Sequence, residues 1–167
     1  MSTDWSDVYR QLFPDLVRFL HRKVWDPDRA RDLAQEAFVR ALQHQPRRPR
    51  PWLFQVAANL ARDEARTVLR RKRHLALLKS ETPEPTAPDP DARLAERERW
   101  DRVKEALEAL GERDRETLLL WDAGLSYAEI ASQTGLAVGA VGTTLARARR
   151  RLVEAHRERE RNDVARG

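Results

Sequence analysis

Residues 124–152 read GLSYAEIASQTGLAVGAVGTTLARARRRL and predict two helices joined by a turn that contains a glycine. Ser126 and Glu129 have the spacing of a capping box, which starts a short helix, and Thr134-Gly135-Leu136 ends it. A longer helix begins near Ala137, and its expected buried residues are Val138, Val141, Leu145, Ala148 and Leu152. This pattern, with small residues facing outward, predicts a helix-turn-helix that fits a DNA major groove. A helix pair that only packs would show the same pattern.

A proline-rich segment separates two helical lobes. Residues 79–91 read KSETPEPTAPDPD, in which four prolines exclude a regular helix and no large apolar residue offers an anchor. We therefore expect a flexible linker at 79–91 between a lobe at 1–78 and a lobe at 92–161, followed by a tail at 162–167. No internal repeat relates the two lobes.

The composition favours an all-α protein and argues against several chemistries. There are only six glycines and few β-branched residues, whereas Ala, Leu, Arg and Glu are abundant. Without cysteine or histidines spaced i, i+4, we expect no metal site and no cofactor. The acids are dispersed and no phosphate loop or nucleophile motif is present, so we expect no enzyme. Without a long apolar run or a signal-peptide pattern, we expect no membrane insertion and a cytoplasmic location.

Caps and prolines predict four helices in the first lobe. The first helix starts near Asp4 and stops before Pro14, which opens the second helix. Asp26 has the residue type of an N-cap and starts the third. The third and fourth helices are expected over about 27–44 and 51–77, with an exposed basic loop at 45–51.

The second lobe begins with an amphipathic helix that ends at Gly111. A shorter helix follows from about Arg113 to Trp121, before a turn at 122–124. The amphipathic helix has apolar residues at spacings of three and four, which predicts that they are buried: Trp100, Val103, Leu107 and Leu110.

Positive charge is concentrated in one part of the first lobe. The whole chain has a formal net charge of +5. Residues 1–46 hold seven acidic and seven basic side chains, whereas residues 47–74 hold nine basic and two acidic ones, a net charge of +7. We expect a polyanion to contact the lobe at residues 47–74.

Three motifs in this order resemble the extracytoplasmic-function class of bacterial sigma factors. They are DLAQEAFVRAL at 32–42, PWLFQVAANLARDEAR at 51–66 and the segment 124–152. The resemblance spans nearly the whole chain and implies sigma domain 2 in the first lobe and sigma domain 4 in the second. Such factors bind core RNA polymerase and direct it to promoters, so the resemblance implies a function in transcription initiation.

The resemblance assigns core-polymerase binding to the third expected helix. Its polar residues lie on a side that the lobe's own core does not need, where acids and an amide can pair with arginines of a partner helix. The alternative for the two acids is a solvated face without a partner. The residues that match the segment docking on the β′ clamp helices are Asp32, Leu33, Gln35 and Glu36.

The resemblance assigns minus-ten recognition to the fourth helix and the basic loop. Promoter opening needs no covalent chemistry, because the protein captures an unstacked base and holds the displaced strand on a positive surface. Asp63 could instead be a charge partner of Arg62 or Arg66. Trp52 and Phe54 could be stacking rings, although the position of Trp52 at a helix start favours the core. The matching residues are Arg47, Arg48, Arg50, Asn59, Arg62, Asp63, Arg66 and Arg70.

The last helix is expected to read the minus-thirty-five element. Many family members carry a lysine and an arginine at the positions of Gly142 and Thr144, so their common promoter sequence does not transfer directly. We expect methyl, backbone and shape contacts near the start of the helix, and phosphate contacts from the arginines that follow. The residues expected to face DNA are Gly139, Ala140, Thr143, Thr144, Arg147, Arg149 and Arg150.

The implied partners are core RNA polymerase, through its β′ clamp helices and β subunit, promoter DNA and an anti-sigma factor. No small-molecule substrate is implied. A helix-turn-helix regulator that does not act as a sigma subunit is the alternative. It would explain the second lobe but leave the acidic face and the basic helix of the first lobe without a task.

Overall fold

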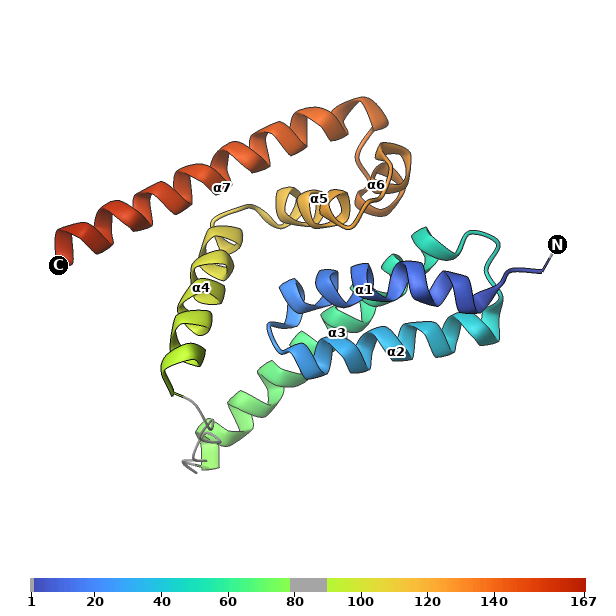
Figure 1. Cartoon of the computed structure of the whole chain (residues 1–167), viewed down its shortest axis with the longest axis horizontal. Coiled ribbons are helices and arrows are strands. Elements are labelled where there is room, and N and C mark those ends of the chain that lie inside the picture. Colours follow the sequence, from blue (N-terminus) through green and yellow to red (C-terminus); the bar gives the residue numbers. More distant parts are fainter. Residues whose placement is uncertain (1, 79–89) are drawn as a thin grey trace. The chain divides into compact units, whose positions relative to one another are not determined.

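A computed structural model describes residues 2–78 and 90–167 of the chain. These ranges contain seven α-helices and no strand, as the composition predicted (Figure 1). The expected linker at 79–91 falls mostly on residues 79–89, which lie outside the described residues. None of the helices within the described ranges has both the length and the apolar character that a membrane span requires.

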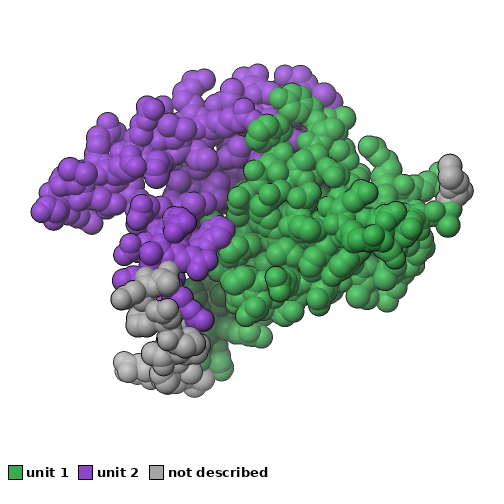
Figure 2. All heavy atoms as spheres, viewed as in Figure 1, with its two compact units in different colours: residues 1–80, 119–129 green, residues 81–118, 130–167 purple. Residues whose placement is uncertain are grey.

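The chain divides into two compact units, coloured separately in Figure 2. Residues 1–80 and 119–129 form the first unit, and residues 81–118 and 130–167 form the second. The three N-terminal helices of the first unit pack against one another (Figure 1).

Helix α1, Trp5–Val24, is continuous through Pro14, so the expectation of two helices here is wrong. Asp4 caps it, with its side chain accepting hydrogen bonds from two backbone N–H groups of the first turn. Pro14 is exposed, and the helix keeps one buried face on both sides of it. That continuous burial offsets the backbone hydrogen bond that proline removes. The buried residues are Leu12, Leu16, Phe19 and Leu20.

Helices α2 and α3 complete this bundle. Helix α2, Pro27–His44, has the expected Asp26 cap, and helix α3 spans Pro49–Leu78. Helix α3 therefore begins before residue 51. The N–H groups of a first helical turn have no partner within the helix, so the prolines there cost the helix no hydrogen bond. The Phe19 and Phe54 rings meet edge to face in the core, with centroids 5.3 Å apart.

The second unit contains helix α4, Pro90–Glu108, which packs on helix α7, Val138–Arg166. Arg159 of α7 forms an ion pair with Glu105 of α4. The α7 helix includes most of the expected tail at 162–167. Leu107 and Leu110 are buried as expected, whereas Val103 is exposed.

The helix-turn-helix is formed by helix α6, Tyr127–Thr134, and α7, with helix α5, Glu112–Asp122, before them. The capping box is confirmed: the Ser126 N–H donates to Glu129 Oε1 at 3.0 Å, and the Glu129 N–H donates to Ser126 Oγ at 3.2 Å. Gly135 has a φ of 77°, which favours glycine in the turn. Val138 is exposed rather than buried, because it lies in the first turn of α7.

Candidate nucleic-acid interface

A row of polar and basic residues runs along the exposed face of α3. Its members recur at spacings of three and four, so they share one side of the helix. All are exposed, and opposite charge is absent from the row. The row includes one residue, Arg73, that the sequence argument left out although the same spacing identifies it. The members are Asn59, Arg62, Arg66, Arg70 and Arg73.

Local contacts leave this row open. Arg62 donates to the Asn59 side-chain oxygen across 3.4 Å, a long hydrogen bond within the same helix. Asp63 was alternatively expected to pair with Arg62 or Arg66. In the described part of the chain, it forms no ion pair with either arginine. These arginines therefore keep donors for an anion.

The basic loop and the two aromatic candidates differ in accessibility. Arg47 and Arg48 are exposed in the loop, whereas Arg50 lies within the first turn of α3 and is half-buried. Phe54 is fully buried and offers no stacking face. Trp52 is half-buried, with its ring centroid 5.6 Å from that of His44.

An ion pair holds the middle of α3 against the start of α2. Arg29 Nε and Nη2 donate to Glu64 Oε1 and Oε2, each at 2.8 Å. These hydrogen bonds lower the pKa of Glu64 and raise the pKa of Arg29, in each case against the effect of burial. The basic helix is thus fixed in rotation relative to α2.

The residues expected to bind core polymerase separate into two groups. Three of these residues, Asp32, Gln35 and Glu36, are exposed on α2. Asp32 Oδ2 lies 3.3 Å from Arg29 Nη1, and Glu36 Oε1 lies 2.6 Å from Arg40 Nη2. Leu33 is only 3% exposed and belongs to the core of the first unit. Its assignment as a contact residue therefore does not fit its position, because a buried side chain offers no surface to a partner.

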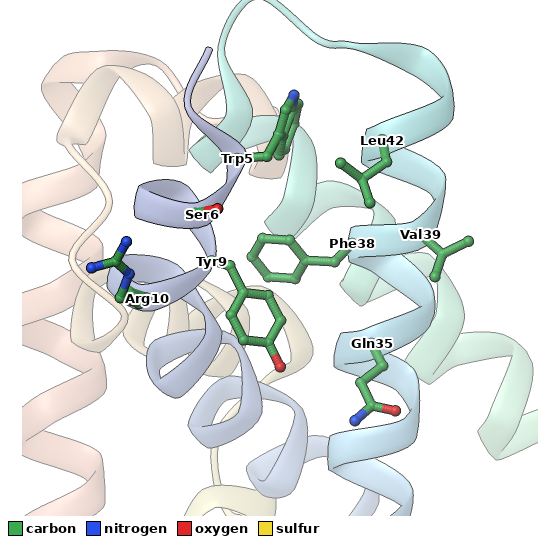
Figure 3. Close-up of a pocket in the computed structure, with 8 residues that line it drawn as sticks. All are labelled: Trp5, Ser6, Tyr9, Arg10, Gln35, Phe38, Val39 and Leu42. Carbon is green, nitrogen blue, oxygen red and sulfur yellow. The ribbon is translucent and has the colours of Figure 1, made fainter.

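Apolar residues continue this surface of α2. Val39 is 54% exposed and Leu42 is 51% exposed. They border a groove of about 700 Å³ between the start of α1 and α2 (Figure 3). The groove is lined by Trp5, Ser6, Tyr9, Arg10, Gln35, Phe38, Val39 and Leu42.

The groove is built on packed aromatic rings. Tyr9 meets Phe38 edge to face, with centroids 5.0 Å apart, and the Trp5 indole N–H donates to Gln45 Oε1 at 2.8 Å. Figure 3 shows Gln35, Val39 and Leu42 on successive turns of α2, with the Val39 side chain directed away from the Tyr9 ring. The exposed acids therefore lie on the same helix as an apolar groove, a combination that the sequence argument did not identify.

The outward face of α7 differs from the expected one at Thr144. Thr144 is only 4% exposed, and its hydroxyl donates to the Ala140 carbonyl oxygen at 2.8 Å, so the expectation that it faces outward is wrong. It borders the buried stripe of Val141, Leu145 and Ala148 and packs with it. Ala140 and Gly142 are half-buried. The exposed residues near the start and middle of α7 include Gly139, Thr143, Ala146, Arg147, Arg149 and Arg150.

Arg147 differs from the other arginines of α7 in its contacts. Its Nε donates to Asp114 Oδ2 at 3.0 Å and its Nη2 donates to Asp114 Oδ1 at 2.7 Å. Asp114 lies in the first turn of α5 and is 5% exposed. The hydrogen bonds from Arg147 hold the pKa of Asp114 below its usual value, although burial raises it.

Both halves of the chain match family models. Residues 8–73 match sigma-70 region 2, and residues 100–152 match sigma-70 region 4. The first match contains α2 and most of α3, and the second contains α5, α6 and α7 as far as residue 152. The first match therefore includes the exposed acids of α2 and the arginine row of α3, and the second includes the exposed residues at the start of α7.

Several curated relatives are similar over most of the chain. The RNA polymerase sigma factor YlaC of Bacillus subtilis is 30% identical over 88% of this chain and 88% of its own length. The ECF RNA polymerase sigma factor EcfG of Rhodopseudomonas palustris is 33% identical over 83% of this chain and 77% of its own length. The probable RNA polymerase sigma factor RfaY of Xanthomonas campestris is 40% identical over 71% of this chain, which spans only 32% of that relative.

Solved structures agree with this fold. The sigma factor RpoE of Bartonella quintana, in complex with the anti-sigma factor NepR, has a TM-score of 0.62 and is 26% identical over 91% of this chain and 96% of its own. CnrH, in complex with the cytosolic domain of CnrY, has a TM-score of 0.63 at 23% identity, covering 90% of this chain and 85% of its own, and shows the fold alone. The chain belongs to the sigma-70 family of RNA polymerase sigma factors, in its extracytoplasmic-function (ECF) group.

Proposed function

We propose that the chain binds core RNA polymerase through α2, contacts and opens the minus-ten element with α3, and reads the minus-thirty-five element with α7. The observation that carries this proposal is the presence of two surfaces of different chemistry on one helical bundle. Helix α2 offers exposed acids beside an apolar groove, whereas α3 offers a row of arginines. A single partner of uniform chemistry would not need both surfaces.

The α2 surface suits a basic protein partner with apolar residues. Asp32 and Glu36 are exposed, and their present partners are arginines of the same helix, which exposed side chains can release at little cost. An arginine from the β′ clamp helices could replace them and gain from the dry environment of an interface. The neighbouring Val39 and Leu42 would supply apolar burial at the same contact.

The α3 surface suits DNA as it opens. The arginine row would follow the phosphates of the displaced strand, with Arg47 and Arg48 extending the positive surface beyond the helix. Binding energy gained on the single strand offsets the cost of unpairing, so opening needs no catalytic group. We propose accordingly that the chain has no catalytic activity of its own.

The α7 surface suits a major groove. The exposed Gly139, Thr143 and Ala146 are small and would let the helix approach base edges closely. Arg149 and Arg150 follow on the exposed side of α7 and would contact phosphates. In the minus-ten region, the half-buried Arg50 of α3 would also contact a phosphate.

We further propose that residues 1–78 and 92–161 are separate domains, that the protein acts in the cytoplasm, and that an anti-sigma factor is a third partner. The last point is supported by the anti-sigma factor NepR, which is bound to RpoE in its complex. Expression of 1–78 and 92–161 as separate chains tests the domain boundaries, because each should be helical and unfold cooperatively.

Transcription with purified core polymerase tests the main proposal. The full chain, core enzyme and a genomic library are combined, and the start sites are mapped. We expect initiation at a defined set of promoters that share sequences near minus ten and minus thirty-five. Footprinting of the chain without polymerase is the control, because a regulator that is not a sigma subunit would protect DNA alone and would not support initiation by core enzyme.

A further inference from the structure

We propose that Asp114 of α5 is a positioning residue that orients Arg147 of α7 to read a guanine in the minus-thirty-five element. This inference rests on the proposed function of α7, and it adds that Arg147 recognises a guanine. It also separates Arg147 from the neighbouring arginines, which the sequence argument assigned to phosphates as one group.

The geometry fixes the Arg147 side chain from one side. Both Asp114 carboxylate oxygens accept hydrogen bonds, one from Nε at 3.0 Å and the other from Nη2 at 2.7 Å. Asp114 is itself buried, so it cannot follow a moving partner. The Arg147 side chain remains 51% exposed, so its far end is accessible while its plane is held.

The donors that remain free form a two-point edge. A guanidinium has five N–H donors in one plane, and Asp114 uses two of them along the Nε and Nη2 side. The second hydrogen of Nη2 and those of Nη1 point away from that side, at the end of the side chain. This end edge matches the O6 and N7 acceptors of guanine, which lie side by side in the major groove.

Charge distinguishes a base contact from a phosphate contact. The negative charge of Asp114 lowers the positive potential around Arg147, and it would repel a phosphate placed nearby. A base edge is neutral and needs donors in a fixed direction more than it needs net charge. The paired Arg147 therefore suits a base.

The other arginines provide the comparison. Arg150 is exposed and has no ion pair within the described residues, so it keeps its full charge for a phosphate. Arg151 Nη1 lies 4.0 Å from Asp114 Oδ2, beyond hydrogen-bond distance, so Arg151 also keeps its donors. Arg147 therefore combines a two-point restraint with exposure, a combination that Arg150 and Arg151 do not show within the described residues.

A promoter library with a randomised minus-thirty-five element tests the proposal. Full-length chain and core polymerase form the holoenzyme, and bound sequences are counted at two salt concentrations. The variants are Asp114→Asn, Arg147→Ala, the double variant and Arg147→Lys, with Arg150→Ala as the control. Thermal unfolding of each free chain is measured alongside.

The wild type should prefer guanine at one position by roughly 5- to 150-fold, the range of one good two-point contact. Arg147→Ala should remove that preference, and Asp114→Asn should reduce it several-fold. The double variant should be no worse than Arg147→Ala, because Asp114 acts through Arg147. Arg150→Ala should weaken all sequences about equally and lower the salt slope by about one ion.

Arg147→Lys keeps the proposal testable if Asp114→Asn does not fold. Lysine retains the charge but lacks the fork, so a guanine preference should fall while binding to other sequences persists. A guanine preference that survives both Arg147→Lys and Asp114→Asn would overturn the inference. Equal weakening of all sequences by Arg147→Ala would also overturn it. Absence of any minus-thirty-five preference in the wild type would instead contradict the proposed function of α7.

Discussion

Arg29 of α2 and Glu64 of α3 meet through two parallel hydrogen bonds, each 2.8 Å long. The Glu64 side chain is 19% exposed, so this pair is better shielded from water than the other ion pairs of α2. Arg29 also lies 3.3 Å from Asp32. One arginine thus connects the proposed polymerase-binding helix to the proposed minus-ten helix.

Replacing Glu64 should loosen this connection. We expect Glu64→Gln to lower the free energy of unfolding by about 1 kcal/mol, since it removes the charge of a partly exposed two-point pair. Urea unfolding followed by circular dichroism measures the change. Glu98→Gln is the matched control, because Glu98 and its partner Arg102 are both exposed and 3.9 Å apart. An equal loss of unfolding free energy in the control would show that the Arg29–Glu64 pair stabilises the fold no more than an exposed pair does.

Lowering the pH should weaken two ion pairs, the one between Arg29 and Glu64 and the one between Arg147 and Asp114. The pKa values of Glu64 and Asp114 are lowered in the folded chain, mainly by hydrogen bonds from Arg29 and Arg147. A lowered pKa means that the stabilisation is present above the ordinary values of 4.5 and 3.8 and is lost as the pH falls through the folded-state values. The free energy of unfolding should therefore decline below about pH 5.

Urea titrations between about pH 7 and pH 3 test this decline. Glu64→Gln and Asp114→Asn should each show a shallower pH dependence than the wild type, and Glu98→Gln should show the same one. Identical curves for all four chains would contradict the assignment of these two carboxyl groups.

Removing the exposed acids of α2 should weaken polymerase binding with little effect on folding. Truncation of one member of an interfacial charge pair commonly costs about 2–5 kcal/mol. Asp32→Ala combined with Glu36→Ala should therefore raise the Kd for core polymerase at least tenfold, whereas Tm should change little because both side chains are exposed. Fluorescence anisotropy with labelled chain measures the affinity. Wild-type affinity in the double variant would remove the assignment.

The apolar residues beside those acids offer an independent test. Val39→Ser with Leu42→Ser should also weaken core binding, because an interface would bury both side chains. Val164→Ser is the control, since Val164 is 82% exposed on α7 and does not line this groove. We expect a loss of roughly tenfold or more in the double variant and none in the control. An unchanged Kd would restrict the interface to the acidic residues.

Two adjacent threonines of α7 should respond in opposite ways to the same substitution. Thr143 is exposed, so Thr143→Arg should alter the preferred minus-thirty-five sequence and leave folding intact. Thr144 is buried, so Thr144→Arg should lower the free energy of unfolding by about 2 kcal/mol or more. Library selection and urea unfolding separate the two effects. A stable Thr144→Arg chain with a new base preference would contradict the orientation of α7.

Local signals explain why much of the fold could be predicted from the sequence. The Asp26 cap and the Ser126–Glu129 capping box depend on residues within one turn, and both are as expected. Pro14 misled the prediction because the cost of a proline inside a helix is local, whereas the burial that offsets it involves residues from other helices. Thr144 misled it because a residue at the edge of a buried stripe turns inward or outward depending on its neighbours.

The parts of the site that could not be predicted are contacts between distant segments. Asp114 lies 33 residues before Arg147, and their pairing depends on how α5 and α7 pack. The groove beside α2 likewise requires rings from α1 and α2 to meet. Spacing within a helix identified the arginine row of α3 without such information.

The separation of faces on α7 has a consequence for how such proteins diversify. Gly139, Thr143 and Ala146 are exposed, whereas Val141, Leu145 and Ala148 hold the helix in place. Exposed positions usually tolerate replacement within about 0.5 kcal/mol, so mutations there are nearly free of folding cost. After gene duplication, a few such replacements could give the copy a new set of target genes while its scaffold stayed the same.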